Sequence, residues 1–286
     1  MVGLQAALIT WWERHGRHDL PWRATTDPWV VLVSELMLQQ TQVPRVVPRY
    51  HAFLDRFPTV AACAAAPVGD VIRAWEGLGY NRRAVNLHRC ATAVVDRHGG
   101  ALPDTLPELL ALPGIGPYTA RAVLVFAFEH DIGLVDTNAG RFVARALAGR
   151  PVAPKEAQAL ADAAVPPGDS WRWGSAVFDL GAAVCTKRDP RHDVCPLRDA
   201  GCAWAAAGFP EPDPVVGSAG ISAPQSRFDG SDRQGRGRLV DALRRGPVPV
   251  EELPAVMGWP ADPDRARRVA ATVTDDGIAV AVGGRY

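Results

Sequence analysis

The stretch that decides the fold reads Leu112-Pro113-Gly114-Ile115-Gly116-Pro117-Tyr118-Thr119-Ala120. Two glycines flank a single apolar residue, which predicts a tight hairpin, and a new helix begins immediately after it. Because no side chain shields the backbone at Gly114 and Gly116, the amides at the start of that helix suit a phosphate oxygen. A simple turn between two antiparallel helices is the alternative interpretation of the same glycines.

The surroundings of the hairpin favour binding to a DNA backbone. A short apolar helical segment over Leu109–Leu112 precedes it, and an apolar helix over Ala120–Phe128 follows it. Together these segments predict a helix-hairpin-helix element.

The first 207 residues read as helices separated by short Pro and Gly punctuation. Asp27-Pro28 predicts a helix start, because a capping carboxylate precedes a proline at the first helical position. No alternating strand pattern of useful length interrupts this region, so the predicted fold class is all-α. The predicted helices cover Trp29–Leu38, Val43–Phe57, Val68–Gly77, Arg82–His98, Leu106–Ala111, Tyr118–Glu129, Ala139–Ala148, Lys155–Ala164 and Trp173–Val184.

The last part of the chain has a different organisation. Residues 208–230 are rich in Pro, Gly and Ser and predict a linker. Residues 231–286 predict three helices, Ser231–Arg245, Val250–Met257 and Asp262–Asp275, followed by a β-hairpin over Ile278–Tyr286. This order is that of a small winged-helix-like module, which usually binds DNA but also occurs as a protein-docking domain.

The overall composition is that of an ordinary globular protein. Of the 286 residues, 48% are hydrophobic and 22% are charged. This composition excludes a mostly disordered chain, a collagen-like chain and a polyacidic or polybasic tail. The 31 Lys and Arg balance the 31 Asp and Glu. Net charge therefore gives no argument for a nucleic-acid partner, although local charge distribution matters more than the sum.

The sequence also indicates a compartment. No apolar run is long enough to span a membrane, and the first residues lack the basic and apolar regions of a secretory signal. Five cysteines, an odd number, point to a reducing compartment rather than a disulfide framework. We therefore expect a cytoplasmic protein without a membrane partner. We also expect a monomer.

Glu35 is the first candidate for chemistry. It lies in the run Trp29–Gln39, which is apolar nearly all round and therefore predicts a buried helix. A lone carboxyl in such surroundings should have a raised pKa, which suits a general acid working near neutral pH. The alternative is a buried glutamate paired with an arginine such as Arg23.

Asp136 is the second candidate. It directly precedes the predicted Ala139–Ala148 helix and alone would be interpreted as an N-cap. A second carboxylate facing Glu35 changes that interpretation, because glycosidic-bond cleavage uses one acid to protonate the leaving group and one anion to stabilise an oxocarbenium-like centre.

The cysteine-rich loop predicts a metal centre. Three thiols and one imidazole are separated by six, two and six residues, at Cys185, His192, Cys195 and Cys202. Unliganded cysteines are the alternative. Cys63 and Cys90 lie in helical sequence and are most simply small buried apolar groups.

With these residues assembled, the first ~205 positions resemble the MutY-type adenine DNA glycosylases of the helix-hairpin-helix DNA glycosylase superfamily. The motifs occur in the order and with the spacing of that family. They are Leu20-Pro21-Trp22-Arg23, Ser34–Val43, Trp75–Tyr80, Leu112–Ala120, Asp136-Thr137-Asn138 and the cysteine loop.

The resemblance implies removal of adenine mispaired with 8-oxoguanine or guanine in double-stranded DNA, during base excision repair. By that resemblance Glu35 would protonate the flipped-out adenine and later activate water. Asp136 would stabilise the sugar cation, with Tyr118 and Asn138 shaping that step. The remaining implied roles are stacking around the lesion by Gln40 and Tyr80, and lining of the adenine pocket by Trp22 and Arg23.

The same resemblance implies a two-lobed glycosylase region over residues 1–207. A six-helix lobe would cover about 28–133, and a cluster lobe would combine about 1–27 with 134–207. Lysine-bearing endonuclease III-type enzymes, which act on pyrimidine lesions, are a rival within the superfamily. Because this chain has Tyr118 where those enzymes have a lysine nucleophile, no Schiff base can form, and a monofunctional enzyme is expected. A non-catalytic DNA-binding protein on the same scaffold is the rival from another class.

The chain departs from the family pattern at three places. The family holds a four-iron, four-sulfur cluster with four cysteines, whereas His192 takes the second position here. We therefore expect a cluster with three Cys and one His ligand, and zinc is the alternative. Residues 231–286 are too few for the Nudix-like domain that reads 8-oxoguanine in typical members. At Trp173-Gly174-Ser175, relatives tend to offer an amide or carboxylate to adenine.

Overall fold

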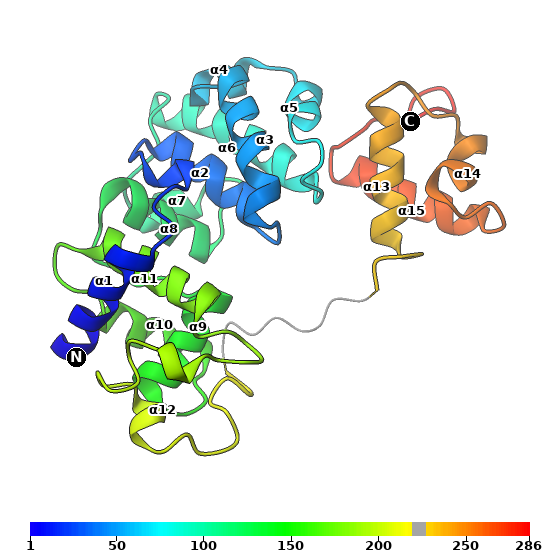
Figure 1. Ribbon diagram of the computed structural model, residues 1–286. Helices are drawn as coiled ribbons and strands as arrows, with labels where there is room; N and C mark the ends of the chain where they lie inside the picture. The colour runs from blue at the N-terminus through cyan, green and yellow to red at the C-terminus, as the bar shows by residue number, and fades with distance from the viewer. Residues whose placement is uncertain (219–226) are drawn as a thin grey trace. The chain divides into compact units, whose positions relative to one another are not determined.

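The structure is a computed structural model that describes residues 1–218 and 227–286 (Figure 1). By its internal contacts the chain divides into two compact units. The first unit contains residues 1–32, 104–110 and 116–218, and the second contains 33–103, 111–115 and 227–286. The described residues are almost entirely helical and contain no named strand, which confirms the predicted fold class. The domain boundaries at 207 and 230 stay predictions.

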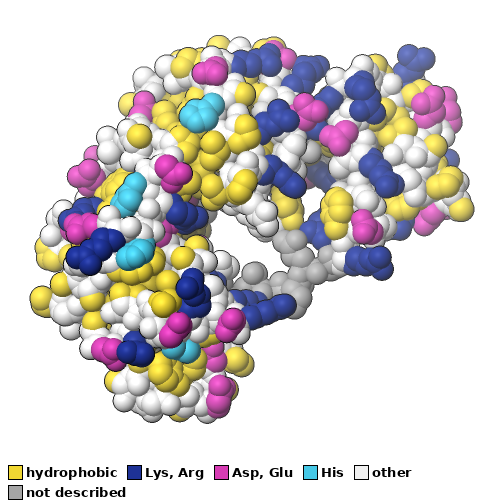
Figure 2. All heavy atoms as spheres, in the orientation of Figure 1, with side chains coloured by type: hydrophobic (Ala, Val, Ile, Leu, Met, Phe, Trp, Pro, Cys, Tyr) yellow, Lys and Arg dark blue, Asp and Glu magenta, His cyan; other side chains and the backbone are white. Residues whose placement is uncertain are grey.

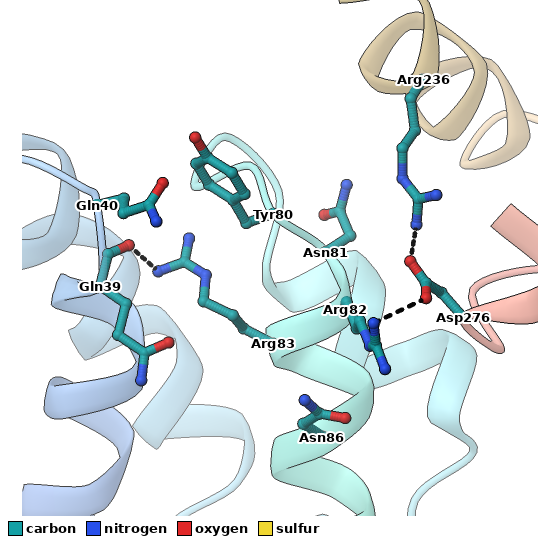
Figure 3. Close-up of a pocket in the computed structure, with 9 residues that line it drawn as sticks. All are labelled: Gln39, Gln40, Tyr80, Asn81, Arg82, Arg83, Asn86, Arg236 and Asp276. Atoms are coloured by element: carbon teal, nitrogen blue, oxygen red, sulfur yellow. Dashed lines mark hydrogen bonds and ion pairs between the residues drawn. The ribbon is translucent and has the colours of Figure 1, made fainter. Parts of the chain in front are cut away.

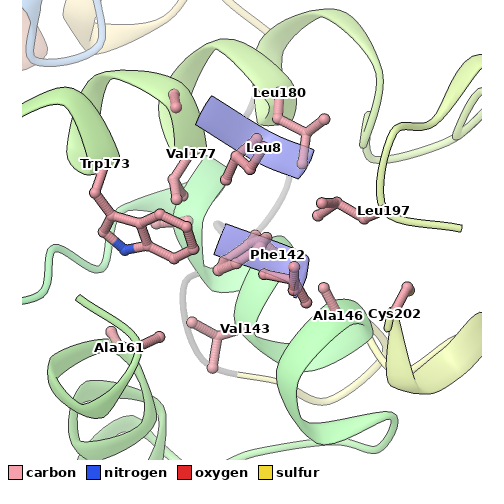
Figure 4. Packing of buried hydrophobic residues seen from close by; sticks show 14 of the residues in the cluster. Leu8, Phe142, Val143, Ala146, Ala161, Trp173, Val177, Leu180, Leu197 and Cys202 are labelled. Carbon is pink, nitrogen blue, oxygen red and sulfur yellow. The ribbon is translucent and has the colours of Figure 1, made fainter. Parts of the chain in front are cut away.

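The first unit is built around α11 (Ser170–Ala183), which packs against α1 (Val2–His15) and α9 (Thr137–Phe142). Apolar side chains at helical spacing on each of these helices converge on one core (Figure 4). The Trp173 indole meets the Phe142 ring edge to face, with 5.7 Å between ring centroids. The other elements of this unit are η1 (Pro21–Arg23), α7 (Leu106–Leu110), α8 (Pro117–Phe128), η2 (Val143–Ala148), α10 (Pro154–Ala163), η3 (His192–Val194) and α12 (Ala203–Ala206).

The second unit is centred on α6 (Arg82–His98), which packs against α4 (Val60–Ala65) and α5 (Val68–Ala74). The core face of α6 carries buried apolar residues, and Gly99 ends the helix in the left-handed conformation, with φ of 62°. The helix α3 (Val43–Arg56) completes this part of the unit.

The C-terminal part of the second unit has a core of its own. The helices α13 (Asp232–Leu243), α14 (Leu253–Met257) and α15 (Pro263–Asp275) pack together, with η4 (Val250–Glu252) before α14. The predicted terminal β-hairpin is reduced to isolated bridges, Pro249 with Arg285 and Val282 with Arg285. Only Arg285 and Tyr286 follow the two glycines at 283 and 284, so the return strand of the hairpin is too short for a ladder. The winged-helix assignment stays a prediction.

The helix α2 (Pro28–Leu38) begins where the sequence predicts. The Asp27 carboxylate accepts hydrogen bonds from the backbone N–H of Trp29 at 2.8 Å and of Val30 at 3.3 Å, which satisfies two unpaired amides of the first turn. The helix passes from the first unit into the second and is buried along most of its length.

Two other predicted segments differ in the structure. The predicted helix 139–148 is α-helical only to Phe142 and continues as a π-helical turn over Val143–Ala148. Within the predicted linker, residues 219–226 lie outside the described residues. The beginning of that linker packs on the first unit, because Trp204 Nε1 donates to the Pro210 carbonyl at 2.9 Å and Asp213 pairs with Arg145. None of the helices that are described is long and apolar enough to cross a bilayer.

Candidate active site and cysteine loop

The carboxyl group of Glu35 is buried within α2. Glu35 is 7% exposed, and its neighbours Ser34 and Leu36 are buried as well. Arg23, its alternative partner, instead directs its guanidinium to Asp179, with an ion pair at 2.7 Å. Glu35 belongs to the second unit and Asp136 to the first, and their predicted pairing stays a prediction.

Asp136 caps α9 with its side chain. One carboxylate oxygen accepts from the N–H of Asn138 at 2.8 Å and of Ala139 at 2.7 Å, and the other accepts from the Asn138 amide nitrogen at 3.0 Å. Burial raises the pKa of Asp136 despite these hydrogen bonds and the positive charge of Arg141. The N-cap interpretation is therefore confirmed, and the same turn holds a carboxyl group whose proton affinity is perturbed.

Arg141 is a buried residue that the sequence does not single out. Its guanidinium donates to the Asn138 side-chain oxygen at 2.7 Å, to the Gly181 carbonyl at 2.6 Å and to the Cys185 carbonyl at 2.9 Å. A Cβ at Gly181 would lie 2.7 Å from the Asn138 Cβ, so glycine allows α11 to approach this turn closely. The Asp136 turn and the first cysteine of the loop are thus joined through one side chain.

The cysteine loop borders one narrow cavity. All four predicted ligands, Cys185, His192, Cys195 and Cys202, line it. No three His, Cys, Asp or Glu side chains of the described ranges converge closely enough to hold a single metal ion. The donors therefore border a common space and are spread around it.

Aromatic and basic side chains form the wall of that cavity. The His192 ring packs against Phe209, with ring centroids 4.3 Å apart, and against Trp204 at 5.2 Å. Arg145 is 1% exposed, pairs with Asp213 at 2.5 Å and donates to Cys185 Sγ at 3.4 Å.

The glycine hairpin has the predicted form. Gly114 has φ of +76°, and a Cβ there would lie 2.5 Å from the Asn86 Cβ on α6. Both the backbone conformation and the lack of space therefore require glycine at this position. Gly116 is the N-cap of α8, and nothing lies within 4 Å of where its Cβ would be. The backbone at Gly116 is consequently exposed at the start of α8. Tyr118 follows in the first turn and lies half-buried near Phe178, at 6.3 Å between ring centroids.

Gln40 and Tyr80 lie at two turns that share one buried residue, Arg83. Both have left-handed backbones, with φ of 54° and 47°, and both are exposed. Arg83 donates to the carbonyls of Gln39 at 2.6 Å and Gly79 at 3.0 Å, which ties the two turns together. Burial lowers the pKa of Arg83 to about 10. The structure thus brings the two predicted stacking residues to one place, through an arginine that sequence reasoning missed.

The predicted adenine-pocket residues Trp22 and Arg23 lie on η1 and are half-buried. Hydrogen bonds and charges from Arg23 and Arg17 outweigh burial and hold the pKa of Asp179 below its usual value. The Ser175 hydroxyl on the same helix is buried and has no hydrogen-bond partner. Arg23 therefore stabilises the buried Asp179 of the first unit, and its contact with adenine stays a prediction.

Comparison with known proteins gives consistent results. The family described as "HhH-GPD superfamily base excision DNA repair protein" matches residues 33–167. The adenine DNA glycosylase of Mycolicibacterium smegmatis is 42% identical over 275 residues, which cover 95% of this chain and 90% of that protein. The adenine DNA glycosylase of Mycobacterium tuberculosis is 42% identical over 287 residues, 98% of this chain and 91% of that protein.

Solved structures show the same fold. A thermostable thymine-DNA glycosylase superposes with a TM-score of 0.65 at 27% identity, over 71% of this chain and 95% of that one. Endonuclease III in a covalent complex with DNA superposes with a TM-score of 0.61 at 19% identity, over 72% of this chain and 95% of that one.

Proposed function

The chain belongs to the HhH-GPD superfamily of base excision DNA repair proteins and within it to the adenine DNA glycosylases, and from this premise we propose that it removes adenine paired with 8-oxoguanine or guanine. It is a DNA glycosylase, and double-stranded DNA is its partner. The observation that carries the proposal is the 42% identity to adenine DNA glycosylases over nearly the whole length of both chains. The choice of opposite base is the part that is proposed.

The two carboxyl groups divide the hydrolysis between them. Glu35 is buried in an apolar helix, which is the environment in which general acids operate, and it donates a proton to the ring of the flipped-out adenine. As the N-glycosidic bond breaks, the bonding electrons leave with adenine and the sugar becomes an oxocarbenium-like cation. Asp136 stabilises that cation, and Glu35 then takes a proton from the attacking water.

Tyr118 and Asn138 assist at the sugar. Asn138 orients the Asp136 carboxylate through its amide, at 3.0 Å. Tyr118 stands in the first turn of α8, where an amine would be needed for strand cleavage through a Schiff base. We therefore expect base removal without strand cleavage, and borohydride should not trap a covalent adduct with DNA.

Contact with DNA relies on the protein backbone at the glycine hairpin more than on the net charge of the protein. The exposed backbone at Gly114 and Gly116 suits a phosphate, and Gln40 and Tyr80 fill the stack from which adenine leaves. Trp22 and Arg23 are proposed to border the adenine pocket. Because its substrate is bacterial DNA by analogy with its relatives, the enzyme would work in the cytoplasm.

We infer that the cysteine loop holds a four-iron, four-sulfur cluster, with zinc as the alternative. Two observations support the inference: the four donors line one cavity, and the chain belongs to the HhH-GPD superfamily. Cys185, Cys195, Cys202 and His192 would hold it. When bound, the group would fix the conformation of this loop, which Arg141 connects to the Asp136 turn.

Replacement of Glu35 by glutamine tests the function. Glu35→Gln keeps the shape of the side chain and removes the acid, so release of adenine from a duplex with A opposite 8-oxoguanine should fall by at least about a hundredfold. Binding of the same duplex should stay within about threefold of the wild type.

The assay should compare A:8-oxoguanine, A:G, thymine-glycol and T:G duplexes. Activity confined to the pyrimidine lesions would favour the endonuclease III-type alternative. Equal adenine release by Glu35→Gln and wild type would refute the role of Glu35.

A further inference from the structure

Arg83 of α6 reaches from the core of the second unit to the end of α2 and to the turn that carries Tyr80 (Figure 3). The residue is 8% exposed, and both terminal nitrogens of its guanidinium donate hydrogen bonds. Nη1 donates to the carbonyls of Leu36 at 2.7 Å, Met37 at 3.0 Å and Gln39 at 2.6 Å. Nη2 donates to the Thr41 hydroxyl at 3.1 Å and to the carbonyls of Leu78 at 3.1 Å and Gly79 at 3.0 Å. One buried side chain therefore connects two segments that are far apart in the sequence.

The Nη1 contacts complete the C-terminal end of α2. The last carbonyls of a helix have no partner within it, and α2 ends at Leu38, so the carbonyls of Leu36 and Met37 belong to this group. Arg83 supplies donors to both, and its positive charge lies at the negative end of the helix dipole. Leu36 directly follows Glu35 in the sequence. The guanidinium therefore fixes the backbone next to the proposed general acid.

The same guanidinium lies beside the ring of Tyr80. Its central carbon is 5.6 Å from the Tyr80 ring centroid and 5.5 Å from that of Trp75, distances at which a cation and an aromatic ring attract each other. Trp75 is fully buried, whereas Tyr80 is 43% exposed. The ring that is proposed to enter the DNA stack thus contacts the side chain that holds the end of α2.

We propose that Arg83 is a positioning residue for adenine release, which sets the place of Glu35 relative to Tyr80. The inference rests on the proposed function, in which Tyr80 enters the stack and Glu35 protonates the adenine that has left it. A guanidinium is planar and its donors have fixed directions, so the groups bound to Nη1 and Nη2 keep a fixed spacing. An error of about 1 Å in the place of a catalytic group costs about a hundredfold in rate. Arg83 therefore acts on the reaction through the backbone next to Glu35.

Arg83→Lys tests this assignment. Lysine keeps the positive charge but has a single terminal nitrogen, so it cannot hold both segments at once. With enzyme in excess over a duplex containing A opposite 8-oxoguanine, the rate constant of adenine release should fall by at least about tenfold. The dissociation constant of that duplex should stay within about threefold of the wild-type value, because the residues proposed to contact DNA remain. Arg121→Lys is the matched control. It removes a guanidinium whose side chain is 17% exposed and which donates to the Gly133 carbonyl, and it should change the rate by less than about twofold.

A double-mutant cycle with Tyr80→Ala separates positioning from a loss of stability. If Arg83 links the Tyr80 ring to α2, the loss of rate caused by Tyr80→Ala should be at least about fivefold smaller in the Arg83→Lys background than in the wild type, because the effects of coupled residues are not additive. A purely structural role for Arg83 gives two factors that multiply. Such multiplication would overturn the inference.

Thr41→Val is the second variant, for use if circular dichroism shows that Arg83→Lys does not fold. It removes one acceptor of Nη2 at a half-buried position and should slow adenine release by about threefold, within the value of one hydrogen bond. An unchanged rate in Thr41→Val, or in folded Arg83→Lys, would contradict the inference, as would weaker binding with an unchanged rate of release. Absence of adenine release from any duplex by the wild type would instead refute the proposed function.

Discussion

The surroundings of two carboxyl groups in the first unit shift their pKa values in opposite directions. Burial raises the pKa of Asp136, while Arg23 and Arg17 overcome burial and lower the pKa of Asp179. The first group lies at a helix start beside Asn138, and the second is 2% exposed and fully engaged by cations and by Trp12. Carboxyl groups with opposed perturbations usually have different tasks, here the proposed catalytic role of Asp136 and the structural role of Asp179.

Asp179→Asn should destabilise the fold strongly. Two guanidinium groups, one of them almost buried, would lose their counter-charge, and breaking such a pair costs about 3 kcal/mol in free energy of unfolding. Because the folded-state pKa of Asp179 is depressed, its stabilisation is present above the unfolded pKa of about 3.9 and is lost as the pH falls through the folded value.

Denaturant titration of wild type and variant checks this expectation at neutral and acidic pH. The difference between them should shrink below pH of about 4. Glu13→Gln removes an exposed partner of Arg172 and should cost less than about 1 kcal/mol. A difference between wild type and Asp179→Asn as small as that control would contradict the structural role.

At the scale of elements, glycines set how closely neighbouring helices approach. Gly114 allows the hairpin to touch α6 at Asn86, and Gly181 allows α11 to touch the Asp136 turn. Any Cβ at these two positions would meet another Cβ at 2.5 Å or 2.7 Å. The hairpin thus takes its position from α6, and the Asp136 turn takes its position from α11.

The loop from Cys185 to Cys202 is the element proposed to hold an iron–sulfur cluster. Protein purified without oxygen should contain about four irons per chain and absorb broadly in the visible region. His192→Cys supplies a fourth thiolate and should retain that absorption, whereas Cys195→Ser should lose most of it. His192→Ala should make the cluster more labile.

Metal analysis distinguishes the alternatives. Zinc in place of iron in the purified protein would contradict the cluster. Full iron content and an unchanged spectrum in His192→Ala would show that His192 is not a ligand. Circular dichroism of each variant serves as the control for folding, since most of the first unit lies outside this loop.

For the molecule as a whole, balanced charge limits how DNA can be held. The sequence has equal numbers of basic and acidic residues, and the face in Figure 2 shows the two kinds interspersed. Many arginines are already paired with acids in the structure, among them Arg73, Arg121 and Arg265. These paired arginines are less available to displace counterions from DNA.

The affinity for DNA should accordingly depend only moderately on salt. Each neutralised phosphate contributes about −0.9 to the slope of log K against log salt, so a slope no steeper than about −5 is expected. Equilibrium binding of an undamaged duplex between low and physiological salt measures it. A slope near −10 would contradict reliance on amides and local arginines.

The sequence was sufficient for the helical fold, the glycine hairpin and the Asp136 N-cap, because each depends on residues that are neighbours in the chain. It did not indicate Arg83 or Arg141. Some of their hydrogen-bond partners are backbone carbonyls more than 40 residues away in the sequence. Arg83 donates to the carbonyl of Gln39, and Arg141 donates to that of Cys185. Carbonyls have no sequence signature, so a buried arginine that gathers them looks like any other basic residue. The π-helical turn at 143–148 was also missed.

The Arg83 contacts have a consequence for the timing of base recognition. A single guanidinium closes both the turn that carries Gln40 and the turn that carries Tyr80, and its withdrawal would release two left-handed backbones together. The two side chains proposed to enter the DNA stack are therefore expected to move together. Interrogation of a base pair should proceed as one concerted step, with no intermediate in which only one of the two residues has entered.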